Sequence, residues 1–297
     1  MKRAMICLRA LGLAGALSCL AGCNWAVLDP GGPVGRDELG IITLSTWLML
    51  LIVAPVIVLT LFFAWRYRAS NVRARYAPDW ERSLGIAAVM VLAPCAIIAV
   101  LGTVAWQSSH RLDPFQALQS PRKPLVIDVV AMDWKWLFVY PEQHIATINQ
   151  VKFPVGTPVE FRITATSVMN SFFIPQLGGQ IYAMPGMQTQ LHLMADRAGA
   201  YDGMSANYSG EGFSDMKFKA VATSQPAFDA WVAATRQGGG ERLSLARYAS
   251  LAQPSLRNPV AVFADVDPRV YDSALRQYQV QTTRVATTDG LCAHPED

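Results

Sequence analysis

The chain of 297 residues is poor in charged side chains and in cysteine. Asp, Glu, Lys and Arg make up 16% of it, whereas soluble domains carry about 25%. The net charge is only +3, which lacks the concentrated basic character of a nucleic-acid-binding domain. Its five cysteines are too few and too scattered for a disulfide scaffold. Because 52% of the residues are hydrophobic, the composition predicts a membrane protein with a substantial water-exposed part.

The first 22 residues have the pattern of an export signal. Basic residues precede a short apolar run, 10–21. A helix needs roughly 20 apolar residues to cross a bilayer, so this run is too short to be a transmembrane helix. The run ends in Ala21-Gly22-Cys23, which resembles a lipoprotein processing site. We therefore expect cleavage between Gly22 and Cys23 and a lipid attached to the Cys23 thiol. The alternative is an ordinary cleavage site with an incidental cysteine.

Two later segments, 41–65 and 84–106, contain no charged residue. Each is long enough to cross a bilayer, and tryptophans mark or flank their ends as in aromatic belts. The loop 66–83 holds five arginines and two acidic residues, so the positive-inside rule predicts that it faces the cytoplasm. We expect a transmembrane hairpin in a bacterial inner membrane, with the lipidated segment 23–40 and everything after residue 106 in the periplasm.

Alternation of period two begins near Pro124 and predicts strands. Turn-forming glycines and prolines separate the alternating runs. The segment 122–224 therefore predicts an all-β sandwich or barrel. The runs are 125–131, 134–140, 159–165, 191–193 and 218–220.

The segment 225–283 changes to a helical pattern. Apolar residues at i, i+3 and i+4, beginning at Phe228, predict one helix. Two further short helices are expected at 243–251 and 267–281. We expect this extension to pack against the sandwich or against a partner, and residues 284–297 to be disordered.

The processing site, the hairpin and an exported sandwich containing the segment 132–136 (Met-Asp-Trp-Lys-Trp) together resemble subunit II of the haem–copper terminal oxidases. The resemblance runs from Cys23 to Tyr278. It implies a membrane-anchored α+β protein: a two-helix transmembrane hairpin, a periplasmic cupredoxin-like β-sandwich and a short helical C-terminal extension. In the cytochrome c oxidase branch, this domain binds a dinuclear copper centre that receives electrons from cytochrome c. Its ligands lie in a D-x-x-H-S stretch and a C-x-E-x-C-x-x-x-H-x-x-M segment.

The positions that match these copper ligands carry unsuitable side chains. Copper here needs soft thiolate or borderline imidazole donors, which a serine hydroxyl does not replace and a phenylalanine lacks altogether. We therefore expect no metal and no cofactor in this chain. The matching residues are Asn170 and Phe213 for the two histidines, Ser205 and Ser209 for the two cysteines, Asn207 for the glutamate, and Met216, which alone is retained.

This loss resembles the quinol oxidase branch of the cytochrome bo type, which the segments 167–175, 180–184 and 203–210 also resemble in order. The resemblance implies a non-catalytic, structural subunit of a complex that oxidises ubiquinol, reduces O₂ to water and pumps protons. Haems, copper and ubiquinol would lie in the partner catalytic subunit. The other expected partners of this chain are the smaller membrane subunits of the oxidase and membrane lipid. Two alternatives are a free-standing cupredoxin-like lipoprotein that binds a protein partner, and a cytochrome c oxidase subunit II with displaced copper ligands.

One departure from the family pattern concerns proton entry. The family often carries a glutamate near the cytoplasmic start of the second span. Alignment on Pro94 places Ala87 there, and an alanine cannot relay a proton. Either Glu81 substitutes for it or the catalytic subunit supplies its own entry.

Other chemistry-bearing residues have plainer interpretations. His192 stands alone on an expected strand and predicts a hydrogen-bonded or surface histidine. The methionines between 169 and 216 predict core packing, because no cysteine or histidine pair accompanies them. Trp134 and Trp136 predict packing, or docking on the catalytic subunit. Cys95 lies inside a span and Cys292 in the tail, so no disulfide is expected.

Overall fold

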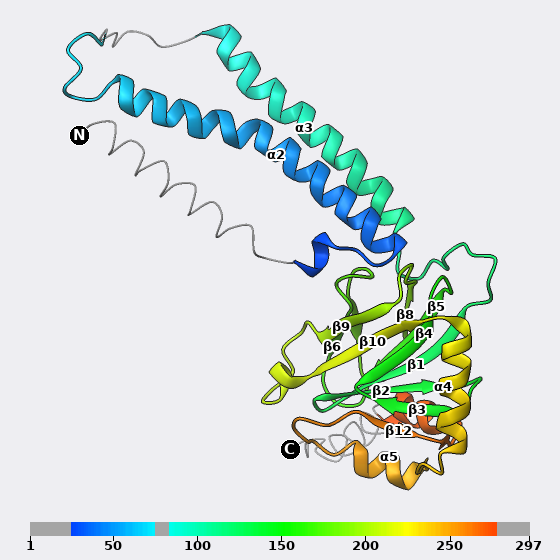
Figure 1. Ribbon diagram of the computed structural model, residues 1–297. Coiled ribbons are helices and arrows are strands. Elements are labelled where there is room, and N and C mark those ends of the chain that lie inside the picture. The colour runs from blue at the N-terminus through cyan, green and yellow to red at the C-terminus, as the bar shows by residue number, and fades with distance from the viewer. Residues whose placement is uncertain (1–24, 75–82, 278–297) are drawn as a thin grey trace, which may run out of the picture.

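The computed structural model describes residues 25–74 and 83–277 (Figure 1). Several expectations fall elsewhere in the chain. The signal segment with Gly22 and Cys23, most of the second half of the arginine-rich loop with Glu81, and the tail with Cys292 lie outside the described residues.

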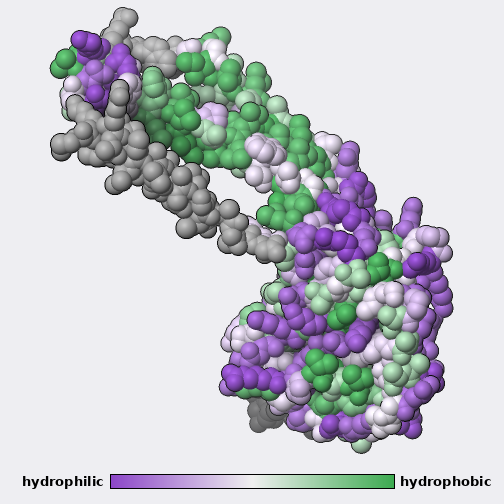
Figure 2. Space-filling view, in the orientation of Figure 1, coloured by the Kyte–Doolittle hydropathy of each residue, from purple (hydrophilic) through white to green (hydrophobic). Residues whose placement is uncertain are grey.

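Two long helices run side by side and project from a β-sandwich (Figure 1). They are α2 (Pro33–Arg66) and α3 (Leu84–Arg111), and both are long and apolar enough to cross a membrane. Each contains its expected span and extends beyond it on the side of the sandwich. The helices are longer than the expected spans because charged residues mark where a chain leaves the membrane but do not interrupt a helix. The apolar surface forms a band over the hairpin, whereas polar residues predominate over the sandwich (Figure 2).

The sandwich consists of two mixed sheets, which confirms the expected fold class. The first sheet has the order β12-β3-β2-β1-β5-β8 and the second the order β4-β10-β9-β6-β7. β1 pairs with β5, and β4 with β10, in parallel, and the other pairs of these two sheets are antiparallel. The strands of the first sheet are β1 (Leu125–Met132), β2 (Lys135–Tyr140), β3 (Ile145–Ile148), β5 (Val159–Ala165), β8 (Thr189–Leu193) and β12 (Ala261–Phe263). Those of the second are β4 (Gln150–Pro154), β6 (Asn170–Phe173), β7 (Ile181–Ala183), β9 (Gly199–Ser205) and β10 (Lys217–Thr223).

An aromatic core fills the space between the sheets. Phe172 of β6 and Phe218 of β10 stack with their ring centroids 5.0 Å apart. Trp136 of β2 meets both rings edge-on, at 5.3 and 5.7 Å. Such pairs stabilise a core beyond the area that they bury. These rings belong to a larger apolar cluster between the sheets, drawn from residues 125–228, which we call the inner core.

The C-terminal extension is a mixture of helices and strands. It contains α4 (Gln225–Gln237), α5 (Leu245–Leu251) and helical residues 270–277. The sequence expectation of helices alone missed β11 (Arg242–Leu243), β12 and β13 (Asp265–Val266). β12 forms because the edge of β3 offers unpaired backbone groups, to which β12 pairs antiparallel.

From Leu243 on, this extension packs on the outer face of the first sheet, whereas Phe228 of α4 packs into the inner core. On the outer face the extension forms a second apolar cluster, which we call the outer core. Its sheet residues include Val130, Leu137 and Val139, and its extension residues include Phe263 and Val270. Every residue of β2 is consequently buried, on both faces of the strand.

The hairpin is joined to the sandwich by short backbone contacts around Gly31. The Gly31 amide donates to the Gln176 carbonyl at 2.7 Å, and the Gly31 carbonyl accepts from the Asp196 amide at 2.8 Å. Gly32 must be glycine, since a Cβ there would clash with the Met194 carbonyl oxygen. An ion pair between Arg197 and Asp29, at 2.8 Å, adds to this junction.

Candidate functional site

The positions that match the copper ligands gather at one end of the sandwich. Asn170 begins β6, and Ser205 ends the neighbouring strand β9. The Ser205 hydroxyl donates to the Asn170 side-chain oxygen at 3.1 Å, and both residues are buried. The Asn170 amide donates in turn to the Val168 carbonyl at 3.1 Å. The fold therefore places these two residues together.

The other four positions line the loop between β9 and β10, which includes η3 (Phe213–Asp215). The Asn207 amide donates to the Met169 carbonyl at 3.0 Å, which ties this loop to the one before β6. The Ser209 hydroxyl lies 4.0 Å from the sulfur of the buried Met216. The Phe213 ring packs against Tyr208 at 5.6 Å.

The donor set does not fit a dinuclear copper centre. Neutral amides and hydroxyls replace thiolates and imidazoles, and they bond to one another and to backbone carbonyls. Within residues 25–74 and 83–277, no three His, Cys, Asp or Glu side chains are grouped as metal ligands. The hydrogen bonds among these side chains and backbone carbonyls join the two loops to each other.

The two tryptophans of the 132–136 segment have different surroundings. Trp136 is fully buried in the inner core. Trp134 occupies the tight turn between β1 and β2 with a φ of 63°, and its indole N–H donates to the Ser209 carbonyl at 3.0 Å. A side chain at Gly212 would clash with the Trp134 ring. Trp134 therefore supports the loop that carries the former copper positions.

Lys135, between these tryptophans, is a site that the sequence did not predict. Its side chain is buried, with 1% of the residue exposed. Its ammonium group donates to the Gln253 carbonyl at 2.9 Å, to the Ser255 hydroxyl, and to the Asp133 carbonyl at 3.3 Å. Burial lowers the pKa of Lys135, and the nearby Asp133 opposes this shift. Lys135 thus connects the turn beneath the loop site to the C-terminal extension.

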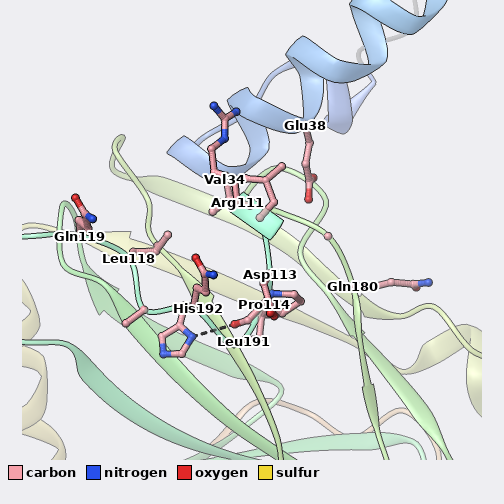
Figure 3. Close-up of a pocket in the computed structure, with 14 residues that line it drawn as sticks. Val34, Glu38, Arg111, Asp113, Pro114, Leu118, Gln119, Gln180, Leu191 and His192 are labelled. Carbon is pink, nitrogen blue, oxygen red and sulfur yellow. Dashed lines mark hydrogen bonds between the residues drawn. The ribbon is translucent and has the colours of Figure 1, made fainter. Parts of the chain in front are cut away.

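A cavity of about 270 Å³ lies where the hairpin meets the sandwich (Figure 3). Its helix side includes Glu38 of α2 and Arg111 of α3, and its sandwich side includes Leu191 and His192 of β8. The linker that follows α3 forms a further wall, which includes Leu118. Charged and apolar side chains therefore face the same small space.

His192 is buried, with 7% of the residue exposed, and its Nδ1 lies 3.0 Å from the Pro114 carbonyl of the linker. A carbonyl only accepts, so Nδ1 carries the proton in this contact. Among the described residues, none forms a hydrogen bond with Nε2. The expectation of a hydrogen-bonded histidine is confirmed for one ring nitrogen.

Other candidates from the sequence are not grouped into a site. Ala87 lies in the first turn of α3, and Cys95 is exposed on the same helix. The expected methionine packing holds for Met216, but Met169 and Met187 are 41% and 55% exposed, because they lie in loops that connect strands.

Two family models match the exported part of the chain. The periplasmic domain of cytochrome c oxidase subunit II matches residues 129–223, which cover most of the two-sheet sandwich. The cytochrome oxidase aromatic-rich motif matches residues 237–281, which cover most of the extension that builds the outer core.

Full-length relatives decide between the branches. The cytochrome bo(3) ubiquinol oxidase subunit 2 of Pseudomonas putida is 54% identical over 88% of this chain and 82% of its own length. The chain belongs to the quinol oxidase subunit 2 family. The ubiquinol oxidase subunit 2 of Acetobacter aceti is 51% identical over 90% of this chain and 87% of its own length. In the same family, quinol oxidase subunit 2 of Bacillus subtilis is 36% identical over 85% of this chain and 79% of its own length.

Solved structures are more distant than these family members. The periplasmic domain of subunit II of cytochrome oxidase from Bradyrhizobium japonicum is 19% identical, with a TM-score of 0.37, over 40% of this chain and 95% of that one. A score this low supports no functional conclusion. Membership of the family does, however, make the chain a subunit of a quinol oxidase complex, an oxidoreductase.

Proposed function

We propose that this chain is the structural subunit II of a proton-pumping ubiquinol oxidase and itself holds no redox centre. The donor set at the loop site is the observation that carries the second half of this proposal. The complex oxidises ubiquinol and reduces O₂ to water. Haems, copper and the quinol site belong to the partner catalytic subunit. The names of the relatives in Pseudomonas and Acetobacter support the substrate.

The two apolar helices fit a membrane-anchored oxidase subunit. We further propose that the sandwich lies in the periplasm and that a lipid on Cys23 adds an anchor. The basic loop after α2 supports this orientation through the positive-inside rule. The lipid would attach two residues before Trp25, which is 63% exposed.

The loop site also supports contact with the catalytic subunit. Three apolar side chains are exposed around it: Val168 at 45%, Met169 at 41% and Tyr208 at 75%. Exposed apolar groups beside one another are typical of protein interfaces. We propose that these loops pack on the catalytic subunit, in the place where the copper-bearing branch transfers electrons.

The test is to purify the whole complex through a tag on this chain, record a reduced-minus-oxidised spectrum, and measure metals and O₂ uptake. We expect haem bands and ubiquinol-driven uptake that added cytochrome c does not raise. The substitution Met216→Leu removes the remaining soft donor while it conserves volume, so uptake and copper content should stay unchanged. Cytochrome c-driven uptake with additional copper would contradict the proposal.

A further inference from the structure

The cavity between hairpin and sandwich contains charges of both signs that suit a zwitterionic ligand. The Glu38 carboxylate points from α2 toward the sandwich (Figure 3). It lies against Gly179: a Cβ at that glycine would come within 3.0 Å of a Glu38 carboxylate oxygen. Glu38 is half-buried and has no cationic partner among the described residues. It therefore brings an unpaired negative charge to the cavity.

The opposite charge lies at the rim. Arg111 extends upward beside Val34, on the membrane side of the cavity (Figure 3). Its guanidinium lies 3.3 Å from Asp37, and 66% of the side chain is exposed. A guanidinium has five N–H donors, so this one contact leaves donors free for an anion. An anion at the rim and a cation within the cavity would both be bound.

The depth of these groups matches the lipid headgroup layer. Glu38 lies three residues before the charge-free span 41–65, which is about 4.5 Å along a helix, and Arg111 lies five residues after the span 84–106, about 7.5 Å. The polar layer on each side of the hydrocarbon core is roughly 5–7.5 Å thick. The backbones of both residues therefore lie in this layer. The Arg111 side chain extends back toward the hairpin and the Glu38 side chain points toward the sandwich, which places the guanidinium nearer to the hydrocarbon than the carboxylate (Figure 3).

From this geometry we infer that the cavity binds the headgroup of an aminophospholipid, phosphatidylethanolamine. The phosphate, which is nearer to the hydrocarbon, contacts Arg111 at the rim. The ammonium reaches away from the bilayer and donates to Glu38. A volume of about 270 Å³ suits a headgroup rather than a whole lipid, since pockets for drug-sized ligands measure about 300–1,000 Å³. The acyl chains remain in the bilayer beside the hairpin.

This inference rests on the proposed membrane orientation and goes beyond the proposed function, because it assigns a lipid to this chain. The bound headgroup would hold together three parts of the chain that meet at the cavity: the two helix ends and β8 with its linker. It would therefore position the sandwich at a constant height above the bilayer.

The experiment uses the complete, delipidated complex in mild detergent. Native mass spectrometry counts the lipids retained after addition of equal amounts of phosphatidylethanolamine, phosphatidylglycerol or phosphatidylcholine. We expect one more retained phosphatidylethanolamine in the wild type than in Glu38→Gln or Arg111→Gln, with affinity at least tenfold weaker in each variant, because each loses a charge-assisted contact. The exposed-charge variants Glu211→Gln and Arg236→Gln, both outside the cavity, should keep the wild-type count.

The three lipids separate the contributions. Phosphatidylglycerol has no ammonium, and phosphatidylcholine has one without N–H donors, so neither should replace phosphatidylethanolamine. Equal retention of all three would overturn the inference, and so would equally tight binding of soluble glycerophosphoethanolamine, which has the headgroup but no acyl chains.

A further variant distinguishes loss of the lipid site from failure of the complex to assemble. Leu118→Trp leaves every charge in place but fills the cavity from the linker, so it should also lose the extra lipid while haem content stays normal. Retention of the lipid in Leu118→Trp would place the lipid elsewhere and overturn the inference. Ubiquinol-driven O₂ uptake of the same samples tests the proposed function separately, since an active complex without the extra lipid contradicts only the lipid site.

Discussion

The inner core and the outer core, on the two faces of the first sheet, take their residues from different parts of the chain. The inner core draws all its residues from 125–228 and closes around stacked aromatic rings. The outer core combines the reverse face of the same strands with residues 243–274. A sandwich with only the inner core would expose the apolar outer face of β1 and β2. The comparison shows that the extension completes the sheet, in agreement with the separate family model that matches it.

The two clusters also differ in the hydrogen bonds that a buried tyrosine hydroxyl forms. Tyr140 of the inner core donates to the Lys152 carbonyl at 3.0 Å and accepts from the Lys152 amide at 2.7 Å. The hydroxyl of Tyr248 in the outer core is buried without a hydrogen-bond partner among the described residues. A lost hydrogen bond inside a protein destabilises it, so the hydroxyl of Tyr248 weakens the outer core, as the indole N–H of Trp136, likewise buried without a partner among the described residues, weakens the inner core.

The largest effect should follow from Phe172→Ala. Phe172 is fully buried and contacts Trp136, Phe161 and Phe218. Removal of its ring should lower the free energy of unfolding by about 3–5 kcal/mol. Denaturant unfolding of the purified chain, followed by tryptophan fluorescence, measures this change. Phe115→Ala, at a ring that is 54% exposed, serves as the control and should change little.

Phe263→Ala tests the outer core at the end of β12. Phe263 is 3% exposed, so its loss should cost about 3 kcal/mol. The destabilisation should be local, since no residue of 243–274 belongs to the inner core. Hydrogen exchange should rise in β12, β13 and 270–277 and stay low in β5, β9 and β10. Faster exchange throughout the sandwich would show that the two clusters unfold as one.

The two tyrosines provide a matched pair of smaller changes. Tyr140→Phe leaves the Lys152 amide and carbonyl without their partner and should destabilise by about 1–2 kcal/mol. Tyr248→Phe removes a hydroxyl that has no partner, so the free energy of unfolding should stay the same or rise by up to about 1 kcal/mol. Thermal unfolding of both variants measures the contrast. Equal losses would contradict the difference between the clusters.

The smallest effect concerns Asp267, which precedes the helical residues 270–277. A hydrogen bond from Arg269 lowers the pKa of Asp267 from 3.8 to about 2. Because the unfolded chain takes up this proton at a higher pH than the folded chain, the contribution to stability is complete above pH 3.8 and is lost as the pH falls to about 2. Asp267→Asn should therefore lose less stability between pH 5 and pH 2 than the wild type. Identical pH profiles of denaturant unfolding would refute this role.

Much of the architecture was predictable because it depends on periodicity. Alternation in 125–131 and 159–165 predicted β1 and β5, and the spacing that begins at Phe228 predicted α4. The strands β6 and β7 were missed because they have only four and three residues, too few for a clear period. The Val-Ala-Val-Phe run 260–263 was a usable signal for β12, since such residues favour strands.

For the candidate sites as well, some features could be predicted from the sequence and others could not. The unsuitability of Asn170, Ser205 and Phe213 for copper could be inferred from residue types alone, because donor chemistry does not depend on the fold. The burial of Lys135 against Gln253 could not, since more than a hundred residues separate them.

The sequence by itself therefore determined the apolar hairpin, the sandwich and the unsuitable copper donors, which depend on composition, local period and the chemistry of single side chains. Only the tertiary structure decided that the extension covers the outer face of the sheet and that Glu38, Arg111 and His192 line one cavity. The physical reason is that these contacts join segments far apart in the chain. Their geometry is set by packing of whole elements, which no local pattern records.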